Sequence, residues 1–457
     1  MDSSKQLGEE NIGKLLIKFS VPAIIGMLVN GLYNVVDRVF LGHIEGVGNL
    51  ALAGVTVTFP IAIMIMAFAM LVGIGSAALI SIRLGQQKKA EAEHILANAF
   101  TLLIVISILV TILGLIFLEP ILLKIGASKD IMPFAKEYIT IILLGAIFQS
   151  VGFGLNNSIR SEGNPKAAMF TMLIGGILNT ILDPIFIFVF DMGTRGAATA
   201  TILSQAISMT WVLYYFFGGK SLLKIRYKNL KLDAKVMKGI FAIGMSPFSM
   251  QLAASIVSII SNRSLVKYGG DIALGAMGVI MSVVMMVLMP TFGINQGCQP
   301  IIGYNYGAKN YHRVKHALFI AIIAATCITV TGFIIIELFP RQIIGLFNKD
   351  PQLLAVGSHG IRIYLMMLPI IGFQIVSSNY FQAIGKAGIS IFLGLSRQVI
   401  LLIPLLFILP RFFGLTGVWM SGPSSDAIAS IITAVFIFIE IKHLNKLQSE
   451  TESITVE

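Results

Sequence analysis

The chain has 457 residues, of which 56% are hydrophobic and only 12% are charged. Soluble domains average about 25% charged residues, so this composition excludes a soluble enzyme, a disordered protein and a secreted disulfide scaffold. The formal net charge is +11, but the basic residues stand in short segments between long apolar ones, which indicates membrane topology and not nucleic-acid binding. Both cysteines lie in apolar stretches, which predicts neither a disulfide framework nor a zinc site.

Twelve apolar segments are long enough to cross a bilayer, whose hydrocarbon core takes about 20 residues of helix. They predict an all-α membrane protein with twelve transmembrane helices. The first segment has no small-residue cleavage site and is followed by further spans, so we expect a membrane span there and not a signal peptide. The expected spans are 14–42, 52–84, 94–118, 133–158, 167–190, 196–217, 239–266, 273–305, 315–338, 356–384, 388–409 and 415–440.

Lysine and arginine gather in alternate loops, most densely in the segment 218–238. Cytoplasmic loops carry such an excess of basic residues, so we expect both termini and this segment to be cytoplasmic. The segment is a basic linker between an N-lobe of six helices (1–217) and a C-lobe of six helices (239–441). A cytoplasmic tail (442–457) completes the chain.

The two halves carry matching residues in the same order, at offsets of 221 to 225 positions. Helix packing would explain each matched glycine by itself. It does not explain why the matches recur in the same order at nearly constant offsets. A duplicated set of six helices predicts two pseudo-symmetric lobes related as parallel repeats, a transporter architecture with the substrate path between the lobes. The matched pairs are Pro22 and Pro247, Asp37 and Asn262, Gly75 and Gly297, Asn157 and Asn379, and Gly193 and Gly414.

Asp37 and Asp183 fall inside the expected spans of the first half. Carboxylates within a bilayer are costly, which makes them candidates for function. Asn179 precedes Asp183 by four residues and so shares its helix face, while Pro184 frees a backbone carbonyl one turn back. Carboxylate, amide and carbonyl oxygens together suit a proton or a small alkali ion.

We expect a cation-coupling site made of these residues with one side chain from each of two further helices. A polar cluster that only locks four helices together is the alternative, and for Asn179 or Thr201 alone the two interpretations weigh equally. The presence of two acids favours function. The expected site is Asp37, Asp183, Asn179, Thr201 and Asn156, with Asp37, Asn179, Asp183 and Thr201 as ligands if the ion is Na⁺.

A substrate cavity is expected beside this site, lined by polar residues of both halves and by adaptable thioethers. Packing or lipid contact is the alternative role for the methionines. The second half carries Ile403-Pro404 where the first half has Asp183-Pro184, and its buried acid Asp426 has no predicted role. The cavity candidates are Asn30, Tyr33, Asn34, Asn157, Gln251, Ser255, Met281 and Met285.

Signals for catalysis are absent from the sequence. No Walker loop for ATP occurs, and the six histidines are isolated and form no paired spacing with acids that would suit a catalytic metal. We therefore expect no enzyme activity and no cofactor other than a coupling ion.

Several segments form recognisable motifs along nearly the whole chain. They are Pro22 with Asn34-Val-Val-Asp37-Arg-Val-Phe-Leu-Gly42, Leu84-Gly85, Arg160-Ser-Glu-Gly163, Leu178-Asn179-Thr-Ile-Leu-Asp183-Pro184 and Arg397-Gln-Val-Ile-Leu-Leu-Ile-Pro404. Together they resemble the multidrug and toxic compound extrusion (MATE) family. The resemblance implies two six-helix lobes that export amphipathic, often cationic drugs in exchange for Na⁺ or H⁺.

The resemblance also carries over individual residues. Asp37, Asn179, Asp183, Thr201 and Asn156 match the N-lobe cation site of the bacterial branch that lacks C-lobe acids. Another branch has a glutamate eight residues after the proline of its seventh helix, where this chain has a serine, Ser255.

The function expected is therefore a multidrug efflux antiporter of a bacterial cytoplasmic membrane. It would exchange organic cations for H⁺ or Na⁺ by alternating access between the lobes, without nucleic acid or an obligate protein partner. A flippase for lipid-linked oligosaccharides or peptidoglycan precursors, from the same superfamily, is the alternative, although the mid-membrane charges are acidic. A purely structural membrane protein is disfavoured by the repeat and the two acids. The coupling ion, the physiological substrate and the lobe that binds it stay open.

Overall fold

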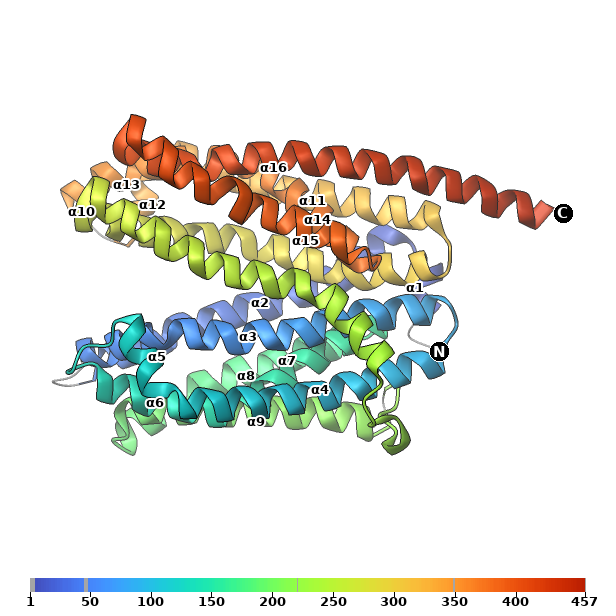
Figure 1. The fold of residues 1–457 in the computed structure, drawn as a ribbon, viewed down its shortest axis with the longest axis horizontal. Helices are drawn as coiled ribbons and strands as arrows, with labels where there is room; N and C mark the ends of the chain where they lie inside the picture. Colours follow the sequence, from blue (N-terminus) through green and yellow to red (C-terminus); the bar gives the residue numbers. More distant parts are fainter. Residues whose placement is uncertain (1–4, 45–47, 220, 348–349, 457) are drawn as a thin grey trace. The chain divides into compact units, whose positions relative to one another are not determined.

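The computed structural model describes residues 5–44, 48–219, 221–347 and 350–456. Within these residues the chain is almost entirely helical and contains no strand (Figure 1). The helices are α1 (Lys5–Glu9), α2 (Ile12–Gly42), α3 (Gly48–Gly85), α4 (Lys89–Ile116), α5 (Leu118–Ile125), α6 (Met132–Leu144), α7 (Ala146–Ser161), α8 (Pro165–Pro184), η1 (Ile185–Val189), α9 (Gly193–Phe217), η2 (Tyr227–Asn229), α10 (Ala234–Gly307), α11 (Tyr311–Leu338), α12 (Pro340–Gly345), α13 (Pro351–Tyr364), α14 (Leu368–Ala383), α15 (Ala387–Leu395), η3 (Ser396–Leu402) and α16 (Ile403–Val456).

Eight helices of the described chain are long and apolar enough to cross a membrane, or ten if two bent pairs each form one span. Two of the eight, α10 and the helix that runs through α15 into α16, are each interrupted at a glycine with positive φ, Gly270 and Gly414. With these breaks, all twelve segments expected from the sequence coincide with helical segments. The all-α membrane fold is confirmed.

Two of the expected spans, 133–158 and 356–384, are bent. The α6–α7 pair bends by 51° at Gly145, and the α13–α14 pair bends by 50°. A Cβ at Gly145 would collide with the Ile202 side chain of α9, so the glycine permits the close approach of α9 at the bend. After Pro184, which cannot donate a backbone hydrogen bond, α8 continues as the π-helical turn η1.

The chain forms two compact units. Unit 1 contains residues 1–9 and 25–248, and unit 2 contains residues 10–24 and 249–457. The leading segments of α2 and α10 are therefore exchanged, because each belongs to the unit built mainly from the other half of the chain. The two boundaries in the chain, after residues 24 and 248, differ by 224 positions, within the range of the repeat offsets.

Glycines make room for both exchanged segments. A Cβ at Gly297 of α10 would lie 2.7 Å from the Ser20 backbone nitrogen of α2, and a Cβ at Gly75 of α3 would collide with the Ile240 carbonyl of α10. Gly75 and Gly297 are one of the matched pairs of the repeat. The backbone contact explains why each of these positions is a glycine.

The basic linker is fastened along unit 1. Glu93 of α4 pairs with Arg226 at 2.7 Å, and the Asn98 side chain accepts a hydrogen bond from the Asp233 backbone nitrogen at 2.8 Å. The buried Glu162 carboxylate accepts hydrogen bonds from the Tyr215 hydroxyl, from Ser221 Oγ at 2.6 Å and from the Leu223 backbone nitrogen at 3.2 Å. These contacts hold the linker against the helices of unit 1.

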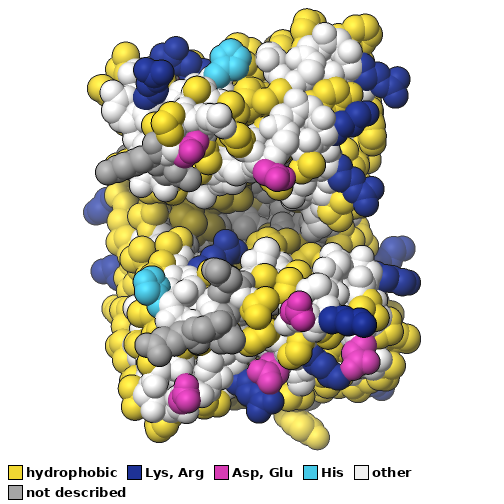
Figure 2. Space-filling view, turned by 90° about the vertical axis from the view of Figure 1, so that its left-hand side faces the viewer, with side chains coloured by type: hydrophobic (Ala, Val, Ile, Leu, Met, Phe, Trp, Pro, Cys, Tyr) yellow, Lys and Arg dark blue, Asp and Glu magenta, His cyan; other side chains and the backbone are white. Residues whose placement is uncertain are grey.

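Each unit has its own apolar core, and many large apolar side chains are exposed. Trp419 lies in the core of unit 2, and Leu143 lies in a core of unit 1, whereas Ile17, Phe319 and Phe438 are 60% or more exposed. Figure 2 shows charged side chains scattered over one end of the molecule and hydrophobic side chains along its margins. This distribution suits a protein whose sides face lipid tails.

Candidate cation and substrate site

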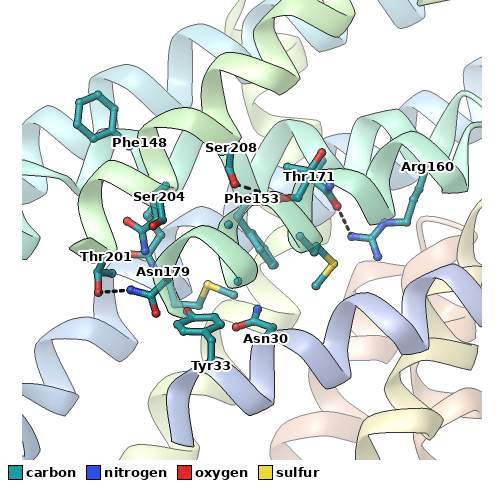
Figure 3. Close-up of a pocket in the computed structure, with 18 residues that line it drawn as sticks. Asn30, Tyr33, Phe148, Phe153, Arg160, Thr171, Asn179, Thr201, Ser204 and Ser208 are labelled. Carbon is teal, nitrogen blue, oxygen red and sulfur yellow. Dashed lines mark hydrogen bonds between the residues drawn. The ribbon is translucent and has the colours of Figure 1, made fainter. Parts of the chain in front are cut away.

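A cavity of about 130 Å³ lies within unit 1, between α2, α3, α7, α8 and α9. Asn30 and Tyr33 project from α2 on one side of it (Figure 3). Asn179 of α8 and Thr201 and Ser204 of α9 line another side. The cavity therefore has several polar groups in a wall that is otherwise mainly apolar.

Asn179 connects the residues at one end of the cavity. Its side-chain nitrogen Nδ2 donates to Asp183 Oδ1 at 3.1 Å and to Thr201 Oγ1 at 3.3 Å. The Thr201 hydroxyl in turn donates to the Ala197 carbonyl at 3.0 Å, so its proton points along its own helix. Three of the five predicted coupling residues are thus joined directly, and Asn179 and Asp183 are almost completely buried.

Asp37, on α2, lies at a depth similar to that of Asp183 on α8. The α8 helix packs closely on α2, because a Cβ at Gly176 would lie 2.6 Å from Val29 Cγ1 and 3.6 Å from Tyr33 Cδ1. Asp37 is one turn beyond Tyr33, and Asp183 is two turns beyond Gly176. As the first and fifth spans these helices run parallel, so the two carboxylates lie within about one helical turn along the axis.

Several buried oxygens in this region accept no hydrogen bond from any described residue. They are Oδ1 of Asp37, Oδ2 of Asp183 and Oδ1 of Asn179. A buried acceptor without a donor costs about 1–3 kcal/mol, so such atoms call for an explanation in a folded protein. A cation bound by all three oxygens would satisfy them together, whereas a proton would satisfy the carboxylate that carries it.

Tyr138 of α6 was not predicted as part of this region. Its ring packs against the apolar cluster of Leu41, Ile187 and Ala197. Leu41 follows Asp37 by one turn, and Ile187 follows Asp183 by one turn. The cluster therefore closes the end of the site beyond the two acids, and Tyr138 contributes to that closure.

Asn156 stands at the other end of the cavity. Its Nδ2 donates to the Ala168 carbonyl at 2.7 Å, and its Oδ1 accepts from Arg160 at 3.0 Å. Ala168 precedes Asn179 by eleven residues on α8, which is about 16 Å of helix. The structure thus joins Asn156 to Arg160 and not to Asp183, and its role in ion coupling stays a prediction.

Only part of the predicted cavity set lines this cavity. Asn30 and Tyr33 do so, whereas Asn34 is exposed and donates to the Asn30 carbonyl at 2.7 Å. Asn157 is buried and accepts from Arg160 at 2.8 Å. The remaining four candidates, Gln251, Ser255, Met281 and Met285, belong to unit 2.

The unit 2 candidates have separate surroundings. Ser255 Oγ donates to the Gln251 carbonyl at 3.3 Å. Met281 packs against the apolar core of unit 2, and Met285 is 53% exposed. Their contribution to a substrate path stays a prediction.

Other lining residues were missed by the sequence analysis. Arg160 is fully within the protein interior and lines the cavity, together with Gln149, Gln205 and Ser208. Ser208 Oγ donates to the Thr171 carbonyl at 3.0 Å (Figure 3). The spacing of four between Asn156 and Arg160 could have placed the arginine on the same helix face.

Asp426, a buried acid of the second half, is paired with an arginine. Asp426 Oδ1 lies 2.5 Å from Arg397 Nε, and Ser425 Oγ donates to the Arg397 carbonyl at 2.6 Å. Asp426 therefore differs from Asp37 and Asp183, whose carboxylates have no cationic partner within 4.0 Å among the described residues.

Neither Asp37 nor Asp183 lines the cavity itself, but Asp183 is hydrogen-bonded to the lining residue Asn179. A duplicated bundle of membrane-spanning helices with buried carboxylates beside a cavity is typical of secondary transporters. The sequence profile of the MatE family matches residues 22–185 and 248–408, once in each half. The chain therefore belongs to the MATE family of multidrug export transporters.

Relatives resemble the chain over almost its whole length. It is 26% identical to the multidrug export protein MepA of Staphylococcus haemolyticus, over 98% of this chain and 97% of the relative. A solved outward-facing multidrug resistance MATE transporter of the MOP superfamily aligns with a TM-score of 0.91 at 26% identity, over 96% and 98% of the two chains. The MATE multidrug transporter DinF-BH, solved in complex with rhodamine 6G, aligns with a TM-score of 0.88 at 40% identity, over 94% and 96%.

Proposed function

We propose that the protein is a multidrug efflux antiporter that exports amphipathic, cationic compounds in exchange for H⁺ or Na⁺. The observation that carries this proposal is the group of three buried oxygens, on Asp37, Asp183 and Asn179, that accept no hydrogen bond from the described residues. A coupling ion supplies what they lack. A proton needs one of the carboxylates, whereas Na⁺ needs several oxygens, including that of Thr201.

The size of the cavity supports a conformational cycle. Drug-sized ligands occupy pockets of about 300–1,000 Å³, and the cavity here measures about 130 Å³. A drug therefore enters only after the wall has moved. The wall formed by α2 is the mobile part of our proposal, because Pro22 interrupts its backbone hydrogen bonds and its two segments pack in different units.

In this cycle the coupling ion and the drug compete for space around α2. Ion binding at Asp37 favours the position of α2 that narrows the cavity beside Asn30 and Tyr33. Drug binding favours the position that widens it and releases the ion. This reciprocal coupling is what antiport requires.

We place the protein in a bacterial cytoplasmic membrane, with both termini and the docked linker in the cytoplasm. The excess of lysine and arginine in the linker supports this orientation, and the staphylococcal relatives support a bacterial host. The substrate class is supported by DinF-BH, which was solved with rhodamine 6G.

One observation favours the alternative, a flippase for pyrophosphate-linked lipid precursors. The guanidinium of Arg160 lines the cavity and would suit an anionic substrate. It is, however, already engaged by the side-chain oxygens of Asn156 and Asn157 at 3.0 and 2.8 Å. Near the opposite end, Oδ1 of Asp37 and Oδ2 of Asp183 accept no hydrogen bond from the described residues, which favours a cationic substrate.

The test is efflux of the dye rhodamine 6G from proteoliposomes, driven separately by a Na⁺ gradient and by a pH gradient. We expect one gradient to accelerate efflux and Asp37→Asn to abolish the acceleration. Asp191→Asn is the matched control, since Asp191 is exposed in the same unit and has a φ of 51°, a conformation that asparagine adopts readily.

Two outcomes would contradict the antiporter. The first is full gradient-driven efflux by Asp37→Asn. The second is no response to either gradient by wild-type protein that is folded in the vesicles, which would move the assignment to the flippase.

A further inference from the structure

A second cavity, in unit 2, combines basic and apolar walls. It measures about 230 Å³ and lies between the first part of α10 and the first part of α16. Arg263, Lys267 and Arg411 provide three cationic side chains, and Ile260 and Leu406 provide apolar surface. We propose that this cavity binds one anionic phospholipid, with the phosphate held by the three cations and an acyl chain along the apolar wall.

The three cations have no anionic partner in the protein. Among the described residues, no carboxylate lies within 4.0 Å of the charged groups of Arg263, Lys267 or Arg411. Lys267 has only a cation–π contact, 5.1 Å from the centre of the Tyr268 ring, which is a weak interaction at an exposed site. Three like charges around one cavity repel each other, so an anion between them would be stabilising.

The depth of the residues fits a phospholipid. Gly270 and Gly414 are the breaks at which the two membrane segments end. Lys267 and Arg411 each precede these glycines by three residues, about 5 Å, whereas Ile260 precedes its glycine by ten residues, about 15 Å. Headgroups occupy about 5–7 Å on each side of the hydrocarbon core, so Lys267 and Arg411 meet the phosphate and the apolar wall meets the acyl chain. Arg263 precedes Gly270 by seven residues, about 10 Å, and its long side chain reaches toward the phosphate from this depth.

The surface beside the cavity suits lipid contact. Phe407 of the cavity is 54% exposed, and the neighbouring Phe412 and Phe413 are 76% and 56% exposed. Aromatic side chains in such numbers would be unfavourable in water. A soluble anion would use the cations but gain nothing from this apolar surface, which is why we assign a lipid and not free phosphate.

The other half of the repeat does not preserve the arrangement. The positions that match Arg263, Lys267 and Arg411 are Arg38, Gly42 and Phe190, at the offsets of 225 and 221. Arg38 lies over the Phe59 ring, 5.8 Å from its centre. The basic cluster is thus specific to unit 2 and is not a by-product of the duplication.

The test is native mass spectrometry of the full-length protein, titrated in mild detergent with phosphatidylglycerol and, separately, with zwitterionic phosphatidylcholine. We expect tighter binding of phosphatidylglycerol. Each basic residue near a membrane surface contributes about a fivefold factor to anionic-lipid binding. The triple variant Arg263→Gln/Lys267→Gln/Arg411→Gln should therefore bind phosphatidylglycerol on the order of 100-fold more weakly.

Control variants separate charge from folding. Arg341→Gln removes an exposed arginine of α12 in the same unit and should bind like the wild type. Arg263→Lys/Arg411→Lys keeps the charge and should retain binding. Each single glutamine variant should lose about fivefold, so the test does not depend on the folding of the triple variant.

The proposal is overturned if the single and triple variants retain wild-type affinity for phosphatidylglycerol, or if phosphatidylcholine binds equally well. Displacement of the lipid by millimolar inorganic phosphate would show a site for a soluble anion and would overturn the assignment to a lipid.

Discussion

The side-chain amide of Asn179 lies 3.1 Å from the carboxylate of Asp183, one turn further along α8. Because Nδ2 of Asn179 faces Asp183 and Thr201, its Oδ1 faces away from both and accepts no hydrogen bond from the described residues. Asn179 thus supplies a donor to one acid and leaves an acceptor free for a ligand. This orientation makes the residue a direct probe of the cation site.

Replacing Asn179 with alanine should weaken coupling without unfolding the protein. A hydrogen bond to a charged group contributes about 1.5–3 kcal/mol, which corresponds to roughly 10- to 100-fold in apparent ion affinity. The measurement is the dependence of dye efflux on Na⁺ concentration or on pH in proteoliposomes. Thr201→Ser keeps the hydroxyl and should retain the wild-type dependence. An unchanged ion dependence in Asn179→Ala would separate this residue from the coupling site.

Gly297→Ala should destabilise the fold. The new methyl group would lie 2.7 Å from the Ser20 backbone nitrogen, and overpacking of this kind costs about 1–3 kcal/mol. Gly278→Ala is the control in the same helix, since a Cβ there meets no atom within 4 Å, and alanine should stabilise it by up to about 1 kcal/mol. Thermal unfolding in detergent measures both, and equal stability of the two variants would disprove the close contact.

Removing Asp426 alone should destabilise the protein more than removing both partners of the Asp426–Arg397 ion pair. Asp426→Leu leaves the Arg397 guanidinium without its partner. In a fully buried pair this change lowers the free energy of unfolding by about 3–5 kcal/mol. Here we expect about 1–3 kcal/mol, since the Arg397 side chain is 31% exposed. The double variant Arg397→Met/Asp426→Leu should recover most of this stability. A double-mutant cycle of unfolding free energies checks the coupling, and purely additive losses would contradict it.

The contact between the Glu162 carboxyl and the linker should make the stability of the fold depend on pH. Burial raises the pKa of this carboxyl, which lies outside the membrane spans, to about 7 from 4.5, against the lowering effect of the hydrogen bonds from Ser221 and Tyr215. Between pH 4.5 and 7 the native state therefore keeps a proton that the unfolded state has lost. The stability that this protonation contributes is complete below about pH 4.5 and is lost as the pH rises through 7.

Glu162→Gln keeps the side chain's shape and removes the titration. Unfolding should therefore become less dependent on pH between 4.5 and 7 in this variant. Thermal unfolding of the wild type and the variant across that range is the measurement. An identical pH profile for both proteins would show that Glu162 does not titrate there.

Much of the fold follows from the sequence because hydropathy and helix spacing are local properties. The twelve spans coincide with helical segments, and the contact between Asn179 and Asp183 follows from their spacing of four. The bend at Gly145 could not be predicted, since it depends on Ile202 of a different helix. A glycine within an apolar helix has the same sequence signature whether or not another helix packs on it.

The cavity was harder to predict than the helices. Around α2, Tyr33 lies about 60° to one side of Asn30 and Asn34 lies about 40° to the other side. The cavity meets the side with Asn30 and Tyr33, and Asn34 is exposed. The sequence allows Asn156 to contact either Asp183 or Arg160, and the tertiary packing places it beside Arg160. Choices of this kind depend on how α7 packs against α8.

The exchanged segments at the start of α2 and α10 have a consequence for the history and the folding of the chain. A single repeat standing alone would have a leading helix segment with nowhere to pack, and the glycine that receives the other repeat's segment, Gly75 or Gly297, would lie uncovered. Two identical copies would complete each other by swapping these segments, as in a domain-swapped homodimer. The present polypeptide keeps that reciprocal arrangement within one chain, so neither half is expected to fold when it is expressed by itself.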